Sequence, residues 1–483
     1  MRKSLVLALL FVLPWLQTIA AHRRVDNAAE LDWAKAGDEA VAVLADYLRV
    51  DTTNPPGNES RAAKFFAALL EKEGIAYRVF ESAPGRSNLY ARIKGSGKKR
   101  PLILLNHTDV VPADSRFWSS GPFSGEVRAG YLYGRGAIDM KSLGIAQSMT
   151  ILLLKRQGVM LDRDVIFLAT ADEEAGGREG AGWFVRNHPE LIRDAEFLLT
   201  EGSSNLVLGE RVVYYGIGTT EKTPCWLRLT ARGAPGHGSV PRRDSAPSRL
   251  LRALGRLEAF ETPVKVTPAV ARYFAAIAEL QSDEDSRRAY ANVEAAIQDP
   301  KLRRLVLSGS QNSALLRNTI QPTVVSIGSK TNVIAPIATA EIDCRLLPGE
   351  RPEDFVATIK AVVADPTIEV ETLLAFPASE SPADTELYQA IIGVSRAESP
   401  SARFVPTVLA GFTDSHFFRD LGIICYGFSP FMIPQGDYNG VHGNDERMPV
   451  ESIRRGTKLM YRIVQSLCAG GAGAPASRGM GQE

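Results

Sequence analysis

Short apolar runs that end in acidic or imidazole side chains constrain this chain more than any other feature. Three of them are LILL at 102–105, followed by His107 and Asp109, VIFL at 165–168, followed by Glu173 and Glu174, and FLLT at 197–200, followed by Glu201. Continuous apolar runs of this length are typical of buried strands. Open α/β sheets bind ligands at the carboxyl ends of their strands. We therefore expect these polar side chains to meet at one edge of a sheet.

Two glycine-rich segments offer further ligands. The GRGAIDMK segment (134–141) presents Asp139 just before an expected helix, and the VHGNDE segment (441–446) supplies His442. An aspartate and a histidine in such turns can point at the same metal ion, whereas unrelated surface loops would scatter them. Each side chain alone is more often structural than a ligand. The ordered set, with its members at strand ends, favours a metal site.

The order of the expected elements is typical of an α/β protein with an inserted domain. We expect helices at 38–48, 61–72, 142–156, 247–260, 268–280, 352–363, 387–395 and 452–467, and strands at 76–80, 89–93, 102–105, 225–231, 323–328, 338–346 and 405–409. Near Glu221 the pattern changes to strict alternation, and near Ala383 the first character resumes. The insertion between the metal motifs and His442 predicts a lid on a discontinuous catalytic domain. The charged segment 287–318 is helical in pattern, and we interpret it as an elaboration of the lid.

These shifts in pattern place the domain boundaries. The expected parts are a signal peptide (1–21), the first part of the catalytic domain (22–220), a smaller α/β lid (221–378), the second part of the catalytic domain (379–468) and a disordered Gly/Ala-rich tail (469–483).

Six segments, in this order, resemble the di-zinc exopeptidase and deacylase family, which includes glutamate carboxypeptidase, aminoacylase, carboxypeptidase S and succinyl-diaminopimelate desuccinylase. The segments are HTDVVP (107–112), PFSGEV (122–127), GRGAIDMK (134–141), ATADEE (169–174), TEGSS (200–204) and VHGNDE (441–446). The resemblance covers roughly residues 43–467 and is fullest to the carboxypeptidase S branch. It implies a zinc-exopeptidase catalytic domain, a mixed sheet flanked by helices, interrupted by a lid that also serves dimerisation.

The resemblance also implies two Zn²⁺ ions per chain, for which Co²⁺ can substitute. It assigns His107 and Glu201 to one ion, Glu174 and His442 to the other, and Asp139 as the bridge between them. Imidazole and carboxylate donors suit zinc, and open coordination positions can hold water.

Five further residues receive roles. We expect Asp109 to hydrogen-bond the far ring nitrogen of His107, which would fix its tautomer. Glu173 is the expected general base, which activates a metal-bridging water. The resemblance implies that Asn332 and Arg345 contact the substrate carboxylate and that His237, in a glycine-rich turn, stabilises the oxyanion, in a dimer at the partner's zinc centre.

Two positions depart from the pattern of the resembled family. Ser142 stands where glycine is common, and His416 stands where arginine is common. Neither touches the metal assignment, but we expect His416 to alter side-chain specificity.

The expected function is zinc-dependent hydrolysis of an amide or peptide bond adjacent to a free carboxylate, as a carboxypeptidase, a dipeptidase or an N-acyl-amino-acid deacylase. The partners are then a small peptide or N-acyl amino acid and a second copy of the chain. Two alternatives stay open: a non-catalytic binding protein that keeps the fold, and a zinc aminopeptidase. The intact Glu173 argues against the first, and the lid insert with Arg345 argues against the second.

Charge and terminal composition bear on partners and compartment. The 56 Lys and Arg residues balance 55 Asp and Glu residues, so no polycationic face for nucleic acid is expected. Residues 1–21 have the basic start, apolar core and small-residue cleavage signal near Ala20 of a signal peptide, with an uncleaved anchor as the alternative. We expect a secreted or periplasmic protein. Asn106 begins a glycosylation acceptor sequence, and a glycan attached there in a eukaryotic secretory pathway would block the metal site. This consequence favours a bacterial periplasm.

The four cysteines (Cys225, Cys344, Cys425 and Cys468) are too widely spaced for a disulfide framework. Cys225 and Cys344 alternate with apolar residues that face a core. We therefore expect buried free thiols.

Overall fold

The computed structural model describes residues 31–470 of the chain. The expected signal peptide (1–21) lies outside this range, as do residues 471–483 of the expected tail. In the described part, no helix combines the length and apolarity needed to cross a membrane.

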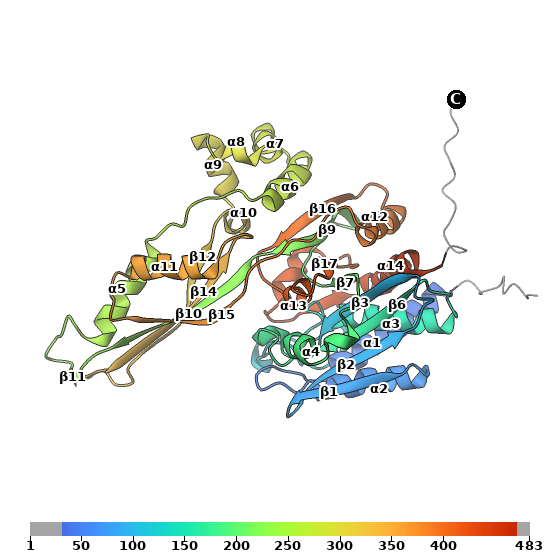
Figure 1. Ribbon diagram of the computed structural model, residues 1–483, viewed down its shortest axis with the longest axis horizontal. Helices are drawn as coiled ribbons and strands as arrows, with labels where there is room; N and C mark the ends of the chain where they lie inside the picture. The colour runs from blue at the N-terminus through green and yellow to red at the C-terminus, as the bar shows by residue number, and fades with distance from the viewer. Residues whose placement is uncertain (1–30, 471–483) are drawn as a thin grey trace, which may run out of the picture. The chain divides into compact units, whose positions relative to one another are not determined.

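Nine strands of the described chain form one mixed sheet (Figure 1). They are β1 (Tyr77–Ala83), β2 (Arg86–Ile93), β3 (Lys99–His107), β6 (Arg163–Thr170), β7 (Phe197–Thr200), β8 (Leu206–Leu208), β9 (Arg211–Glu221), β16 (Arg403–Leu409) and β17 (Ile424–Gly427). Their order is β1-β2-β6-β3-β7-β17-β9-β16, with β8 beside β9. The central strands β6, β3, β7 and β17 are parallel neighbours, whereas β2 pairs antiparallel with both β1 and β6.

Helices cover both faces of the parallel centre, which is why its strands are apolar along their length. On one face α3 (Lys141–Arg156) packs against α1 (Trp33–Leu48) and α14 (Val450–Cys468). On the other face α4 (Ala181–Asn187) and α13 (Ser415–Arg419) bury Phe184 and Phe418 against Ile103 and Leu105 of β3. Two further helices, α2 (Ser60–Lys72) and α12 (Glu386–Glu398), pack against β2 and α14 respectively. This is the mixed sheet flanked by helices that the sequence predicts.

A second, antiparallel sheet lies within residues 221–378, the expected lid, and we keep the name lid for this part. It has four strands in the order β12 (Thr319–Ile327), β14 (Ile337–Leu346), β10 (Thr223–Arg232) and β15 (Glu369–Ala375). Two helices, α5 (Ala246–Glu258) and α11 (Pro352–Val363), cover one face of it. The alternation expected for Cys225 and Cys344 is present, because both side chains lie in the core beneath these helices. All four cysteines are free and buried, as expected.

Several short strands and 3₁₀ helices lie between these elements. They are the pair β11 (Gly236–His237) and β13 (Val333–Ile334), the three-stranded sheet of β18 (Arg447–Pro449), β5 (Tyr131–Tyr133) and β4 (Glu126–Arg128), and the 3₁₀ helices η1 (Ser115–Phe117), η2 (Glu173–Ala175), η3 (Pro189–Leu191), η4 (Ala278–Leu280) and η5 (Gln435–Gly440).

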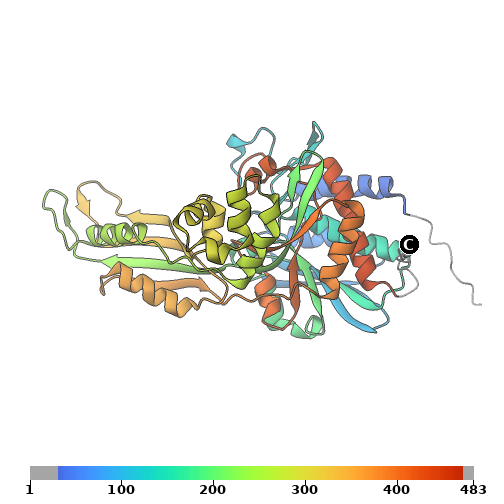
Figure 2. The same cartoon turned by 90° about the horizontal axis from the view of Figure 1, so that it is seen from above.

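A group of short helices within the expected lid segment contacts the catalytic sheet. It consists of α6 (Pro268–Ile277), α7 (Glu284–Ala291), α8 (Val293–Ala296), α9 (Pro300–Leu307) and α10 (Ser310–Leu315). Phe274 and Leu316 lie in one apolar cluster with Val405 and Val408 of β16, so α6 packs against this edge strand of the catalytic sheet, and α7 and α8 pack on α6 (the yellow-green helices in Figure 2). The interpretation of residues 287–318 as an elaboration of the lid stays a prediction, because the contact with β16 is made mainly by α6, which precedes them. A helical pattern shows that a face is apolar but does not show which element it will contact.

Two chain crossings join the catalytic sheet to the lid, and buried charges mark the first. β9 continues into β10 through Lys222, whose Nζ donates to the carbonyl oxygens of Ala314 (2.8 Å) and Arg317 (2.9 Å). The preceding Glu221 forms a buried ion pair with Arg419 at 2.7 Å.

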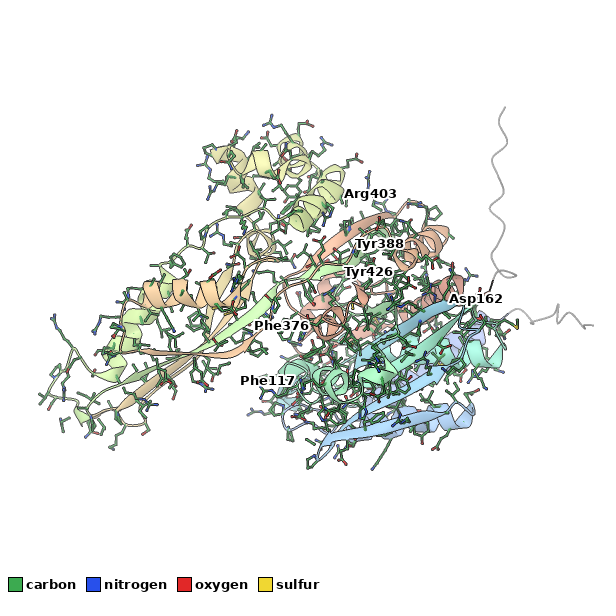
Figure 3. The ribbon with its side chains drawn as sticks, in the orientation of Figure 1. Phe117, Asp162, Phe376, Tyr388, Arg403 and Tyr426 are labelled. Atoms are coloured by element: carbon green, nitrogen blue, oxygen red, sulfur yellow. The ribbon has the colours of Figure 1, made fainter. Side chains whose placement is uncertain are left out.

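At the second crossing, Phe376 follows β15. Figure 3 labels Phe376. Its ring stacks on that of His416 in the catalytic part, with 3.6 Å between the ring centroids. Aromatic stacking therefore holds the returning chain against the catalytic domain.

Candidate metal centre

Three parallel strands deliver ligands to one edge of the large sheet, as the apolar runs predict. His107 is the last residue of β3, and Glu201 follows β7 directly. Glu173 and Glu174 begin η2, just after a turn in which Asp172 has a φ of 70°. Because β6, β3 and β7 are adjacent and parallel, their carboxyl ends reach the same edge of the sheet.

Asp139 lies at the middle of the centre. Its Oδ1 is 3.1 Å from Nε2 of His107, which in turn is 3.5 Å from Oε1 of Glu201. Its Oδ2 is 3.2 Å from Nε2 of His442, and the same nitrogen is 3.2 Å from Oε2 of Glu174. Each carboxylate oxygen of Asp139 therefore faces a different pair of one imidazole and one carboxylate.

The acidic and imidazole groups at this edge shift one another's pKa values. Burial, reinforced by the charges of Asp139 and Glu174, raises the pKa of Glu201 to about 8. Hydrogen bonds to Asp139 and Glu174 raise the pKa of His442 to about 10. Oε1 of Glu174 is buried with no hydrogen-bond partner in the described chain. Crowded buried carboxylates beside imidazole nitrogens form a donor set that suits divalent cations.

Glu173 lies within the same centre. One ligand atom each of His107, Glu173 and Glu201 falls within 4.8 Å of the others, as is also true of His107, Asp139 and Glu174. Burial raises the pKa of Glu173 well above its ordinary value, and the charge of Glu201 adds to this effect. The geometry thus permits Glu173 either to bind a cation or to face a reacting water.

Asp109 lies behind His107, but two acceptors share the ring nitrogen. Nδ1 of His107 is 3.1 Å from the backbone oxygen of Asp109 and 3.4 Å from its Oδ1. The Asp109 carboxylate accepts hydrogen bonds from the backbone N–H groups of Glu173 and Glu174 (3.1 Å each) and from Nδ2 of Asn54 (2.8 Å). Asp109 therefore fixes both the imidazole and the turn that carries the two glutamates.

Sequence analysis missed Asn54. Its Nδ2 lies 3.3 Å from Oδ1 of Asp172 as well as near Asp109, so it joins the two carboxylates behind the centre. The Asn-Pro-Pro-Gly sequence at 54–57 indicates a turn, but nothing in that signal shows that the turn meets the ends of β3 and β6.

A cavity of about 690 Å³ opens beside the acidic cluster. Its polar wall includes Asp139, Glu173, Glu174, Glu201 and His442, and its apolar wall includes Ile138, Met140, Leu143, Leu409, Phe431, Ile433, Tyr438 and Val441. The lid contributes Trp226 and Arg345. Among the described residues, the cavity lining therefore combines a charged wall, an extensive apolar wall and one arginine.

Arg345 is present at the cavity but is not free. Its Nε and Nη2 donate to the two oxygens of Asp343 at 2.6 and 2.8 Å. The guanidinium carbon lies 5.0 Å from the ring centroid of Phe412 and 5.6 Å from that of Trp226. The alternation that places Arg345 away from the core also places Asp343 beside it, two residues earlier on β14. Sequence analysis missed Asp343, although its i,i+2 spacing was a signal for this contact.

His237 and Asn332 lie on the lid, away from this cavity. His237 pairs with Val333 in the small β11–β13 sheet, is exposed, and its Nδ1 lies 2.7 Å from Oγ of Ser239. The backbone oxygen of Asn332 accepts from the N–H of Gly238. Among the described residues, the cavity lining includes neither of the two side chains. The structure therefore does not bring them to the centre of their own chain.

His416 is also outside the cavity lining. Its ring lies between Phe376 and Phe417, and burial lowers its pKa to about 4. Nδ1 of the ring is 2.9 Å from the backbone oxygen of Thr413. Among the described residues, its contacts are with protein rather than with the cavity, so nothing in this geometry supports a direct effect on specificity. Ser142 is buried in the first turn of α3.

The mixed sheet, the lid and the acidic centre together define a metallo-exopeptidase or amidohydrolase that acts on peptide or linear amide bonds. Residues 103–466 match peptidase family M20/M25/M40, and the chain belongs to this family. The family membership and the enzyme class expected from the six motifs are thus confirmed.

Relatives match along most of the chain. The N-fatty-acyl-amino acid synthase/hydrolase PM20D1 of Xenopus tropicalis is 30% identical over 449 residues, which cover 89% of this chain and 86% of the relative. Aminoacylase-1B of Rattus norvegicus is 27% identical over 436 residues, covering 89% of this chain and 95% of the relative. The metallo-carboxypeptidase Sso-CP2 of Sulfolobus solfataricus has a similar structure, with a TM-score of 0.68, 19% identity and coverage of 89% of this chain and 99% of that one.

Proposed function

We propose that this enzyme hydrolyses an amide bond adjacent to a free carboxylate, with N-acyl amino acids and small peptides as substrates, at a centre of two Zn²⁺ ions. The observation that carries the proposal is the placement of Asp139, whose two oxygens face two separate imidazole–carboxylate pairs. His107 and Glu201 would hold one ion, and Glu174 and His442 the other. Mixed imidazole and carboxylate donors favour zinc over magnesium or calcium.

The cations and the protein would divide the chemistry between them. Two cations in this centre would polarise the substrate carbonyl and lower the pKa of a bound water. Glu173 is in the cavity lining and is held through its backbone N–H by Asp109, so its carboxylate is placed to take a proton from the attacking water. The same group can then give the proton to the leaving nitrogen. Asp109 and Asn54 keep the turn and the His107 ring fixed.

Arg345 is the proposed anchor for the substrate carboxylate. It is the arginine that the lid contributes to the cavity lining, and a guanidinium can bind a carboxylate through two parallel hydrogen bonds. Asp343 already accepts from Nε and Nη2, so Nη1 and the second Nη2 hydrogen remain for the substrate. Asp343 would hold the fork in a fixed orientation between Trp226 and Phe412.

The apolar wall supports an uncharged acyl group on the other side of the scissile bond. Leu143, Phe431 and Ile433 line the cavity together with Tyr438 and Val441. An aliphatic acyl chain would bury apolar surface there, at about 25 cal/mol per Å², whereas a free ammonium group would lose its water. The names of the two curated relatives, an N-fatty-acyl-amino acid synthase/hydrolase and an aminoacylase, agree with this preference.

A homodimer would complete the site. His237 is exposed on the lid and lies outside the cavity lining of its own chain, so it could serve only a neighbouring centre or a rearranged lid. The edge strand β12 exposes Val324 (49%) and Val325 (51%), a surface that a second copy could cover. In such a dimer the imidazole could donate to the developing oxyanion of the partner's substrate.

Export to the periplasm, with cleavage of the signal peptide near Ala20, is part of the same proposal.

A substrate screen tests the proposal. Purified, zinc-loaded protein would be assayed with N-acyl amino acids of increasing acyl length, with dipeptides, and with the amides of the same amino acids. We expect the highest kcat/KM for N-acyl amino acids with a free carboxylate. Equal turnover of substrates whose carboxylate is blocked would contradict the proposal, and activity confined to free amino termini would point to an aminopeptidase.

A further inference from the structure

Glu446 is a buried carboxylate that binds the loop carrying Asp139. Its Oε1 accepts from the backbone N–H groups of Ile138 (2.7 Å) and Asp139 (3.0 Å), and its Oε2 accepts from that of Gly136 (2.8 Å). The residue is 0% exposed. Three backbone donors of one loop thus converge on a single side chain from a distant part of the sequence. This side chain does not belong to the ligand set described above.

Arg135 completes the contact in the opposite direction. Its Nη1 donates to Oε2 of Glu446 at 2.8 Å, and its Nη2 donates to the backbone oxygen of Gly443 at 2.6 Å. The Nη1 group also lies 3.4 Å from the backbone oxygen of Gly440. Glu446 therefore accepts hydrogen bonds from the loop that carries Asp139, while Arg135 donates hydrogen bonds to the loop that carries His442.

Both ligand loops need external support, because neither ligand sits within a helix or strand. Asp139 lies between β5 and α3, and His442 follows η5 with a φ of 55°, which non-glycine residues rarely adopt. The contacts between the loops are charge-assisted and buried, and such contacts hold geometry more firmly than exposed ones. One backbone bond, from the N–H of Gly134 to the oxygen of Glu446, runs alongside them.

We propose that Glu446 and Arg135 form a positioning pair that sets the distance between Asp139 and His442 and thereby the affinity of the centre for its second cation. The inference rests on the proposed metal centre. Asp139 Oδ2 and His442 Nε2 are 3.2 Å apart, and a shift of either loop would open the pair that faces Glu174. His107 ends β3 and Glu201 directly follows β7, so this pair depends less on these loops.

Glu446→Gln is the direct test, with zinc as the probe. The amide places an NH2 group, which cannot accept, where one carboxylate oxygen stood. Either the contacts of Oε2 with the N–H of Gly136 and with Nη1 of Arg135 are lost, or the contacts of Oε1 with the N–H groups of Ile138 and Asp139 are lost. We expect the weaker zinc site to lose about 10–100-fold in affinity, measured by competition with a chromophoric chelator. In the cobalt-loaded variant the visible absorption should change, because the ligand field at the His442 side is altered.

Asp437→Asn is the matched control. Asp437 is a buried carboxylate of the same segment, and its Oδ1 accepts from Nε (2.9 Å) and Nη2 (2.7 Å) of Arg447, but among the described residues it is not paired with either ligand loop. Its variant should lose stability while keeping wild-type zinc affinity and cobalt spectrum. Loss of zinc affinity in this control equal to that in Glu446→Gln would overturn the proposal, as would a Glu446→Gln variant with wild-type affinity and spectrum.

Arg135→Lys keeps the proposal testable if Glu446→Gln does not fold. Lysine retains the charge opposite Glu446 but cannot also reach the carbonyl oxygen of Gly443 with a second planar nitrogen. We expect the same selective loss at the second site, and unchanged zinc binding would overturn the proposal. A wild-type chain that binds no zinc would instead overturn the proposed function, so the two failures are distinguishable.

Discussion

Nε2 of His442 lies 3.2 Å from Oδ2 of Asp139, although the whole lid and the helices α6–α10 separate the two residues in the sequence. The candidate metal centre therefore takes its side chains from two sequence-distant parts of the chain. Cation binding should stabilise the docking of the closing segment as well as serve catalysis, because a ligand that binds only the folded state raises its stability.

The first prediction concerns metal content. We expect about two zinc ions per chain in the wild type and about one in His442→Ala, since one imidazole–carboxylate pair loses its nitrogen donor. A chelator should abolish activity, and zinc or cobalt should restore it. Elemental analysis of both proteins provides the measurement. Full activity after complete metal removal is the result that would contradict a metal mechanism.

The Glu173→Gln variant tests whether Glu173 acts as the general base or as a metal ligand. If Glu173 moves protons, zinc content should stay near the wild-type value while kcat falls by about 10²–10⁴-fold. The comparison needs kcat and elemental analysis on the same preparation, with Glu174→Gln as the variant expected to lose metal. Loss of zinc in proportion to activity would place Glu173 in the ligand set, which its closeness to His107 and Glu201 permits.

Arg345→Ala tests the carboxylate anchor. Because the guanidinium is expected to bind the free carboxylate, KM should rise about tenfold or more for free acids and change little for the corresponding amides. Asp343→Ala is the companion variant. It should weaken the same discrimination less, since Arg345 keeps its charge but loses its bidentate partner. An equal effect of Arg345→Ala on acids and amides would exclude the anchor.

Sharing of the site between two chains is tested by mixing variants. His237→Ala and Glu173→Gln should each be nearly inactive. Co-expression should restore about a quarter of the wild-type activity, because random pairing makes half of the dimers mixed and each mixed dimer holds one intact site of two. Gel filtration must show that the species is dimeric. A dimeric mixture no more active than either variant would rule out sharing.

The lowered pKa of Lys222 predicts that the free energy of unfolding depends on pH. Burial lowers its pKa to about 7, whereas the pKa of a lysine in the unfolded chain is about 10.4. Between these values the unfolded chain binds one more proton at this position, so this group makes the free energy of unfolding rise as the pH rises from about 7 to about 10. We expect Lys222→Met to show a smaller rise than the wild type across this window in chemical unfolding. Parallel curves for the two proteins would contradict the shifted pKa.

Local pattern was sufficient for the elements and for the ends of the central strands. The continuous apolar runs before His107, Glu173 and Glu201 predicted strands that are buried on both faces. Such strands are typical of parallel sheets with helices on each side, and these three strands are parallel neighbours. The strict alternation around Cys225 and Cys344 likewise predicted one covered face of the lid sheet. In each case the responsible interactions lie within a few residues, so the sequence alone carries the signal.

The tertiary structure decided which surfaces meet. The helices of residues 268–315 have an apolar face that could have packed on the lid, yet it covers Val405 and Val408 of the catalytic sheet. The contacts of Glu446 with the loop of Asp139, of Asp343 with Arg345, and the exposure of His237 likewise depend on how distant segments pack. The hydrophobic effect is non-directional, so an apolar face in the sequence does not show which other segment it will contact. Only the folded chain could show these pairings.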